Sequence, residues 1–201
     1  MPVVIIDSGG ANLASVVYAL ARLGVDTIVT HDAAIIRSAE RVLLPGVGNA
    51  SAIMARLNAH DLVPVVQSLT CPVLGICLGM QLLFDRSAEG NTSGLGVISG
   101  NIEALRGRHD LPAPHMGWNT LRRWQDDPLL EGCGDADWFY FVHNYLAPVD
   151  ATYTVTTTEY GEEFSSIVRR KNFCGVQFHP ERSGKSGARL LENFVRLSSC
   201  A

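Results

Sequence analysis

Short apolar runs alternate with helical patterns along the first hundred residues. Four runs are almost continuously hydrophobic, as is typical of parallel strands buried on both faces, and we predict strands at Val3–Asp7, Val25–Val29, Arg41–Leu44 and Val73–Ile76. Segments with helical periodicity separate them, which predicts helices at Asn12–Leu23, Ala50–Asn58, Leu62–Leu69 and Leu78–Phe84. This alternation predicts a three-layer α/β fold, in which helices cover both faces of an open, mostly parallel sheet.

The second half of the chain has shorter strand patterns, more turns and fewer helices. We predict strands at Leu95–Ile98, Trp118–Leu121, Trp138–Val142, Tyr153–Thr158, Ser165–Arg170 and Phe173–Phe178. The chain closes on an amphipathic helical segment, Ser186–Leu197, with an apolar stripe along one face. No repeat or low-complexity linker interrupts the pattern. We therefore expect one domain over residues 1–201, with a partly antiparallel extension of the sheet.

The composition supports a globular protein and argues against several functional classes. The 201 residues are 47% hydrophobic, which is enough to bury one full core. Because only 18% of residues are charged and the net charge is −4, we expect neither nucleic acid nor an anionic membrane as a partner. The apolar runs are too short to cross a bilayer, and the first of them lacks the basic leader of a signal peptide.

The cysteines and histidines form no pattern of their own. Five cysteines contain no CxxC pair, and their odd number does not fit a disulfide framework. We therefore expect a reduced, cytoplasmic protein in which one thiol is functional. The six histidines are scattered without ligand spacing, so we expect no metal site, and we expect no cofactor.

The pentapeptide Gly75-Ile76-Cys77-Leu78-Gly79 follows an apolar run and has the form of a nucleophile elbow. In such a turn, the flanking glycines leave room for the strained backbone of the nucleophile, whose side chain stands above the sheet. A buried structural thiol is the alternative, but packing alone does not need glycines two residues before and after the cysteine. The turn also places Cys77 at a helix N-terminus, where main-chain N–H groups favour a thiolate.

Phe178-His179-Pro180-Glu181 follows another apolar run near the end of the chain. Alternate residues of a strand face the same way, so His179 and Glu181 should point together across the proline. By themselves they can also be an ion pair on a solvated surface. With Cys77 they complete a nucleophilic triad of thiol, imidazole and carboxylate. The order nucleophile, histidine, acid differs from that of the α/β-hydrolases and indicates another lineage of cysteine enzymes.

The segment Pro45-Gly46-Val47-Gly48 directly follows the third predicted strand. A glycine-rich turn here can be an ordinary strand-to-helix connection. Open α/β sheets, however, bind their ligands at the carboxyl ends of the strands. An N–H group of this loop, at Val47 or Gly48, can join that of Leu78 to form an oxyanion hole.

Several blocks of sequence resemble a known family. The loop Pro45–Gly48, the elbow with its continuation to Gln81, and His179-Pro180-Glu181 together resemble the class I, triad-type glutamine amidotransferases. Within that class, the blocks His115-Met116-Gly117-Trp118-Asn119, Phe141-Val142-His143-Asn144-Tyr145 and Gly175–Glu181 are similar to the glutaminase subunits of imidazole glycerol phosphate synthase. The resemblance covers essentially the whole chain and implies a flavodoxin-like amidotransferase fold.

The resemblance implies that Cys77, His179 and Glu181 hydrolyse glutamine to glutamate and ammonia. It also implies a glutamine site made of Gly46, Gly48, Gln81, Asn144 and Tyr145. The ammonia would pass to a (β/α)₈-barrel cyclase subunit, in a heterodimer that makes imidazole glycerol phosphate and aminoimidazole carboxamide ribotide for histidine biosynthesis. The same resemblance assigns the contact with that subunit to Asn12, Met116, Trp118, Tyr140 and Arg182.

Two positions depart from the family pattern. The first turn reads Asp7-Ser8-Gly9-Gly10-Ala11-Asn12, without the tyrosine that usually follows the aspartate and with Ala11 in place of a glycine. Arg182 follows the triad acid where the family often has lysine, and arginine preserves the charge but not the geometry. Both departures lie where the partner should dock, so they affect the predicted interface rather than the predicted chemistry.

Other functions stay open on the sequence alone. The chain can serve another synthase, such as anthranilate or aminodeoxychorismate synthase, or be a stand-alone thiol hydrolase of the same sheet type. It can also be a non-catalytic subunit that regulates a partner, although the complete triad argues against this. For Trp118, a core position on a strand is as good an interpretation as a place in the interface.

Overall fold

The centre of the molecule is an eight-stranded sheet in the computed structural model, which describes residues 2–9, 13–109 and 111–198. Five strands run parallel: β1 (Val3–Ile6), β2 (Thr27–Thr30), β3 (Val42–Gly46), β4 (Val73–Cys77) and β14 (Phe173–Val176). An antiparallel extension adds β13 (Glu163–Arg170), β12 (Thr154–Glu159) and β9 (Arg122–Arg123). The strand order is β2, β1, β3, β4, β14, β13, β12, β9.

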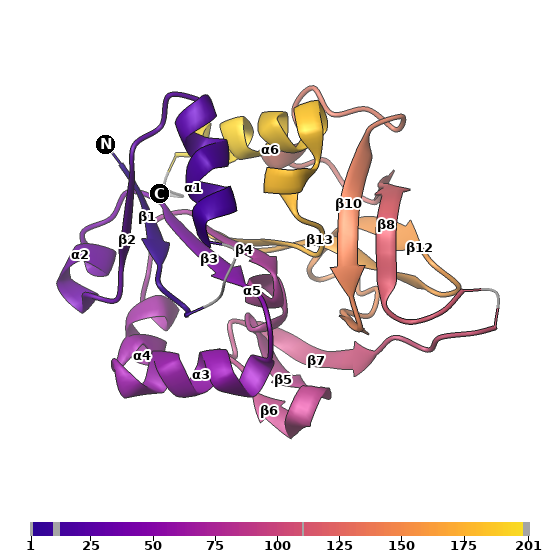
Figure 1. Ribbon diagram of the computed structural model, residues 1–201, viewed down its shortest axis with the longest axis horizontal. Coiled ribbons are helices and arrows are strands. Elements are labelled where there is room, and N and C mark those ends of the chain that lie inside the picture. The colour runs from indigo at the N-terminus through magenta and orange to yellow at the C-terminus, as the bar shows by residue number, and fades with distance from the viewer. Residues whose placement is uncertain (1, 10–12, 110, 199–201) are drawn as a thin grey trace.

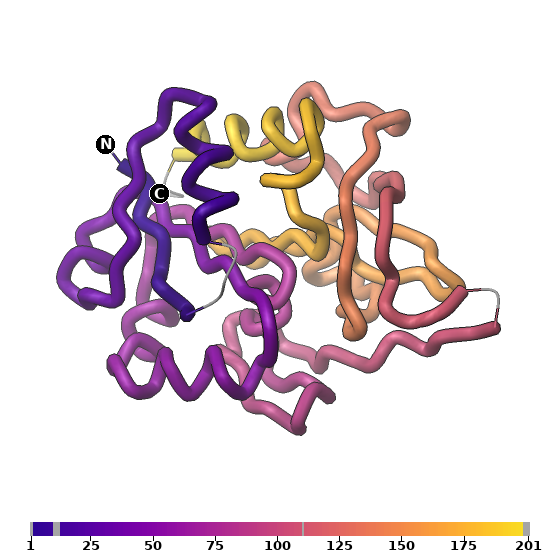
Figure 2. The backbone as a smooth tube through the Cα atoms, in the orientation of Figure 1, coloured from indigo at the N-terminus to yellow at the C-terminus, as the bar shows by residue number. Residues whose placement is uncertain are grey.

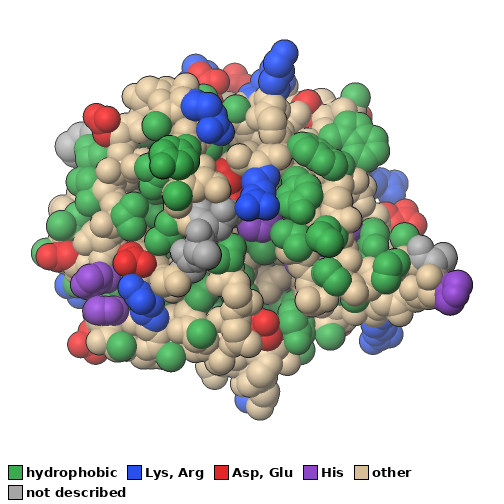
Figure 3. Space-filling model, in the orientation of Figure 1, with side chains coloured by type: hydrophobic (Ala, Val, Ile, Leu, Met, Phe, Trp, Pro, Cys, Tyr) green, Lys and Arg blue, Asp and Glu red, His purple; other side chains and the backbone are tan. Residues whose placement is uncertain are grey.

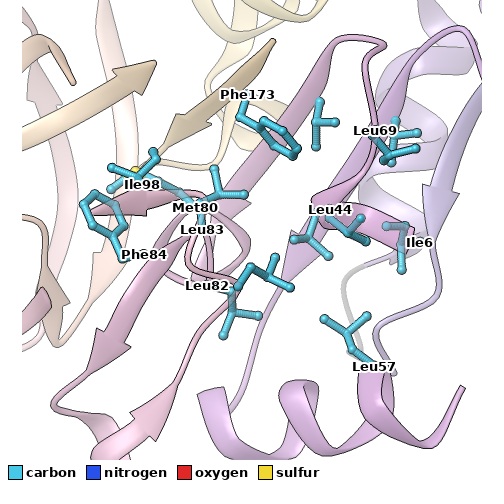
Figure 4. Packing of buried hydrophobic residues seen from close by; sticks show 14 of the residues in the cluster. Ile6, Leu44, Leu57, Leu69, Met80, Leu82, Leu83, Phe84, Ile98 and Phe173 are labelled. Atoms are coloured by element: carbon cyan, nitrogen blue, oxygen red, sulfur yellow. The ribbon is translucent and has the colours of Figure 1, made fainter. Parts of the chain in front are cut away.

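Helices cover both faces of this sheet, as Figure 1 shows. One face carries α1 (Leu13–Arg22) and α6 (Gly184–Arg196), and the other carries α2 (Ala33–Arg37), α3 (Ala50–Ala59) and α4 (Leu62–Gln67). Alternation along β1 explains why both faces are covered. Val3 and Ile5 join the buried cluster that includes α1 and α6, whereas Val4 and Ile6 join the cluster of α3 and α4. Figure 4 shows part of this second cluster.

Two smaller sheets complete the fold. The strands β8 (His115–Thr120) and β10 (Trp138–His143) form an antiparallel ribbon. A four-stranded sheet consists of β5 (Phe84–Ser87), β6 (Thr92–Ser93), β7 (Ile98–Ala104) and β11 (Tyr145–Leu146). The short helices are α5 (Leu78–Gln81), η1 (Glu89–Asn91), η2 (Pro128–Leu130) and η3 (Pro180–Arg182). In Figure 2 the ribbon of β8 and β10 lies beside α6, against which β10 packs.

The predicted three-layer α/β fold with an antiparallel extension is confirmed, but the predicted helix Leu78–Phe84 is wrong in its second half. The helix α5 ends at Gln81, and Phe84 already begins β5. The cause is long-range pairing of the main chain: Leu95 N donates to Leu82 O at 2.7 Å, and Val97 N donates to Leu83 O at 2.8 Å. These bonds occupy the carbonyls of Leu82 and Leu83, so the helix ends in a turn at these residues and the chain continues as β5, although its hydrophobic pattern also suits a helix.

Other strand boundaries also differ from the prediction. The strand predicted at Leu95–Ile98 is β7, which starts only at Ile98, and β8 begins earlier than predicted, at His115. The strand predicted at Val25–Val29 is β2, the edge strand of the main sheet, where Ile28 and Val29 are exposed instead of buried. No helix among the described residues combines the length and the apolar character needed to span a bilayer.

Candidate active site

The turn between β4 and α5 holds Cys77 in a strained conformation, with φ of 53° and ψ of −110°. This region is rarely populated by residues other than glycine. The flanking glycines are required by close packing: a Cβ atom on Gly79 would lie 1.8 Å from Leu44 O, and one on Gly75 would lie 2.6 Å from Gly79 O. The structure therefore has the nucleophile elbow that the pentapeptide predicts.

His179 and Glu181 follow β14, the strand next to β4, and form the predicted pair. His179 Nδ1 lies 2.8 Å from Glu181 Oε1, and both side chains are almost fully buried. A carboxylate only accepts hydrogen bonds, so Nδ1 carries the proton and Nε2 is left for the thiol. Burial by itself lowers the pKa of His179, but hydrogen bonds and charge interactions with Cys77 and Glu181 outweigh it and raise the pKa to about 10. The imidazolium form of His179 is thus favoured in this site.

Strand register brings the Pro45–Gly48 loop to the nucleophile. In the pairing of β3 with β4, Gly46 lies opposite Cys77. The hydroxyl of Ser8 donates to Pro45 O at 2.8 Å, so the turn after β1, where the sequence departs from the family pattern, is tied to this loop. Val47, Gly48 and Leu78 line one cavity with Cys77. The three residues predicted for the oxyanion hole therefore share one cavity with Cys77, at the carboxyl ends of β3 and β4.

The cavity above Cys77 has a volume of about 260 Å³, which is on the scale of a small ligand. Every residue of the predicted glutamine site lines it: Gly46, Gly48, Gln81, Asn144 and Tyr145. Three further lining residues were not predicted, namely Glu89, Val142 and His143. Glu89 comes from η1, which lies between the predicted helix Leu78–Phe84 and the predicted strand Leu95–Ile98. Its carboxylate accepts a hydrogen bond from Ala50 N at 2.8 Å.

Gln177 is another residue of the site that sequence analysis missed. It directly follows β14 and is completely buried, and its Nε2 donates to Cys77 Sγ at 3.8 Å. The available signal was its position two residues before His179, on the same side of an extended chain. No group of three or more potential metal ligands occurs in the described parts of the chain.

The residues predicted to contact a partner lie on the ribbon of β8 and β10 and on η3. Met116 and Trp118 are exposed by 62% and 52%, Tyr140 is half-buried against Trp118, and Arg182 is exposed. The core interpretation of Trp118 is therefore wrong. Figure 3 shows hydrophobic side chains on the molecular face that carries β8 and β10. Trp138 on β10, which was not predicted for this contact, is 54% exposed. Asn12 lies outside the described residues.

Main-chain contacts join this ribbon to the triad. His179 N donates to Tyr140 O at 2.8 Å, and Tyr140 N donates to Ser183 Oγ at 2.9 Å. Ser183 Oγ in turn donates to His179 O at 2.7 Å. The main chain of His179 is thus held directly by β10, the strand that carries Tyr140.

Comparison with known proteins decides the family. A model of the glutamine amidotransferase class-I family matches residues 4–197. The chain belongs to this family. The family resemblance read from the motifs is therefore confirmed.

Relatives agree with this assignment, and solved structures share the fold. This amidotransferase is 50% identical, over 200 residues and the full length of both chains, to imidazole glycerol phosphate synthase subunit HisH of Idiomarina loihiensis. It is 48% identical over 203 residues to the protein of the same name from Photorhabdus laumondii, with 98% of this chain and 100% of the relative covered. A crystal structure of a glutamine amidotransferase superposes with a TM-score of 0.76 at 19% identity, covering 97% of each chain. The structure of PurLQS from Thermotoga maritima superposes with a TM-score of 0.69 at 16% identity, covering 96% of this chain and 97% of the other.

Proposed function

We propose that this chain is the glutaminase subunit of an imidazole glycerol phosphate synthase, which hydrolyses glutamine and delivers the ammonia to a cyclase subunit. The observation that carries the proposal is the full-length identity of about half to relatives that bear this name. The geometry of Cys77, His179 and Glu181 supports the glutaminase chemistry. No cofactor or metal is needed for this reaction.

The first half of the reaction transfers the γ-glutamyl group to sulfur. The Cys77 thiolate attacks the side-chain carbonyl carbon of glutamine, and the carbonyl oxygen becomes an oxyanion. N–H groups of Leu78 and of the Val47–Gly48 segment, which line the same cavity, are the proposed donors to that oxyanion. The imidazolium of His179 gives its Nε2 proton to the departing nitrogen, and the C–N bond breaks to release ammonia.

The second half returns the enzyme to its starting state. His179, now neutral, takes a proton from water, which attacks the thioester carbonyl. The C–S bond breaks, glutamate leaves, and the pair of thiolate and imidazolium is restored. Glu181 keeps the imidazole in the Nδ1-protonated tautomer throughout, because its buried oxygen accepts that hydrogen bond.

The cavity also suits the amino-acid end of glutamine. We assign substrate binding to Gly46, Gly48, Gln81, Asn144 and Tyr145, all of which line it. Glu89 adds a carboxylate from η1, which is complementary to the α-ammonium group of the substrate.

The proposed partner is a (β/α)₈-barrel cyclase that docks on the ribbon of β8 and β10 and on η3. The apolar side chains of Met116 and Trp118 provide hydrophobic contact area there, and Arg182 adds a positive charge at its edge. We assign Tyr140 and Asn12 to the same contact. Docking on this ribbon would act on the triad through the bond from His179 N to Tyr140 O.

The test is glutamate release from glutamine by the chain alone, by the chain with a cyclase subunit, and by the mixture with the nucleotide ligand of the cyclase. We expect strong stimulation only in the mixture. Cys77→Ala should abolish glutamine-dependent synthesis, while the cyclase in the same complex still uses free ammonia. Equal glutaminase activity with and without the cyclase would assign the chain to another synthase or to independent hydrolysis.

A further inference from the structure

A chain of buried hydrogen bonds reaches the sulfur of Cys77 from the side of Gln177. The Gln177 side chain is completely buried, and its Nε2 donates to Cys77 Sγ at 3.8 Å. Its Oε1 accepts from Gln81 Nε2 at 2.9 Å. The thiol itself donates through Sγ to Val142 O at 3.7 Å. An ionised sulfur loses that contact, since it has no proton to donate, but still accepts from Gln177.

A main-chain carbonyl fixes the direction of this chain. Tyr145 O can only accept, so the Gln81 atom that lies 2.8 Å from it must be Nε2. The two hydrogens of that nitrogen then go to Tyr145 O and to Gln177 Oε1. This leaves Nε2, rather than Oε1, of Gln177 beside the sulfur. The orientation of both amides therefore follows from the one carbonyl, without reference to Cys77.

A buried pair of histidines, His115 and His143, also holds the carbonyl oxygen of Tyr145. His143 Nδ1 donates to Tyr145 O at 2.8 Å, so its Nε2 accepts from His115 Nδ1 at 3.0 Å. Burial lowers the pKa of His115 to about 4 and, together with the charges of His115 and His179, that of His143 to about 3. Both rings are neutral near pH 7, so this second set of bonds keeps a fixed direction there.

We infer that Gln177 is a positioning residue for the nucleophile: oriented by Gln81 and Tyr145 O, it directs a side-chain N–H at Cys77 Sγ and favours the thiolate. The inference rests on the proposed role of Cys77 as the nucleophile. Hydrogen bonds to an ionised acceptor are the stronger kind, because the donor meets a full charge in a medium of low dielectric constant. The neutral amide of Gln177 donates such a hydrogen bond without adding a charge to the site.

Titratable groups around the sulfur set the background for a test. The cavity with Cys77 is lined by the titratable residues His179, His143, Tyr145 and Glu89, and Glu181 stands behind His179. Gln177 does not titrate, so its removal should move the midpoint of thiolate formation without adding a step. This is an effect that a merely structural role does not produce.

The experiment is the rate of Cys77 alkylation by iodoacetamide, followed on the Cys77 peptide by mass spectrometry between about pH 5 and pH 10. Gln177→Met replaces the amide by an apolar side chain of similar shape. We expect the midpoint of its pH profile to move up by about one pH unit, and the rate at pH values well below the parent midpoint to fall roughly tenfold. Gln177→Glu should move it further, because a carboxylate accepts where the amide donates.

Asn193→Leu is the matched control, since Asn193 on α6 is a buried amide that donates to Leu129 O and Glu131 O, away from the cavity. Its alkylation profile should equal that of the parent. A folded Gln177→Met protein with the parent midpoint would overturn the inference. In the unsubstituted protein, the ¹⁵N signal of the Gln177 side-chain amide should titrate with the alkylation midpoint, and a signal that stays constant would overturn it as well.

Different results would contradict the proposed glutaminase function and the positioning role of Gln177. Absence of protection of Cys77 by glutamine in the parent protein would contradict the glutaminase function. Normal protection together with an unchanged profile in both Gln177 variants would contradict only the positioning role.

Discussion

Replacement of the triad acid by its amide, Glu181→Gln, tests how the imidazole is prepared for proton transfer. In the parent, Glu181 Oε1 lies 2.8 Å from His179 Nδ1, and its side chain is fully buried. A carboxylate can only accept, so it holds the proton on Nδ1 and leaves Nε2 facing Cys77. A glutamine side chain can present an N–H group to Nδ1, which favours the opposite tautomer and leaves Nε2 unable to take the thiol proton.

Glu181→Gln should lower the activity strongly because it changes both the tautomer of His179 and the charge beside that imidazole. In a comparable triad, replacement of the acid by its amide lowers kcat ~10⁴-fold, which corresponds to about 5.5 kcal/mol of transition-state stabilisation. Loss of the carboxylate also removes one of the interactions that raise the pKa of His179 to about 10, so that pKa should fall. KM for glutamine should change little, since Glu181 does not line the cavity above Cys77.

The assay is steady-state glutamate release by the chain in complex with a cyclase subunit, with a titration of His179 by NMR alongside. Glu192→Gln makes the same chemical change on α6, where the carboxylate pairs with Arg196 at the surface, and should leave kcat unchanged. If Glu181→Gln lowers kcat by less than about tenfold and His179 titrates as in the parent, the assigned role of the acid is refuted.

Three further predictions concern folding, pH and the partner. Gly79→Ala should lower the free energy of unfolding by about 3 kcal/mol or more in a denaturant titration, because its Cβ would lie 1.8 Å from Leu44 O. Gly134→Ala, whose added Cβ meets open space, should leave the free energy of unfolding almost unchanged. Equal losses of stability in the two variants would refute the packing argument. The pKa values of His115 and His143 are lowered to about 4 and about 3, so the unfolded chain binds more protons below pH ~6.5. Stability should therefore fall from there toward about pH 4, by at most about 1.4 kcal/mol per pH unit for each histidine, and a flat profile in chemical denaturation would contradict this. Trp118→Ala should weaken cyclase binding roughly 30-fold or more in calorimetry, as expected for a hot spot of about 2 kcal/mol, with an unchanged melting temperature; unchanged affinity would remove this residue from the interface.

Much of the site could be read from local sequence because its chemistry depends on local constraints. Gly79 is needed for the close approach of the elbow to β3, and Gly75 for the close approach of β4 to the main chain of the elbow itself. The spacing of His179 and Glu181 allows their hydrogen bond. Gln177 and Glu89 gave no comparable signal, because a lone amide or carboxylate is ordinary in any sequence. Only the parallel pairing of β14 with β4 brings Gln177 to the sulfur.

The sequence by itself determined the α/β class of this protein, its parallel core strands, the nucleophile elbow and the residues of the triad, because each is marked by short local patterns of residue types. It did not determine where α5 ends, that β2 is an exposed edge, or that Trp118 lies on the surface. Those features depend on main-chain hydrogen bonds and packing between distant segments, such as Leu82 with Leu95. Local propensity cannot predict them, since the free energy of tertiary contacts exceeds the small differences between helix and strand in a short apolar run.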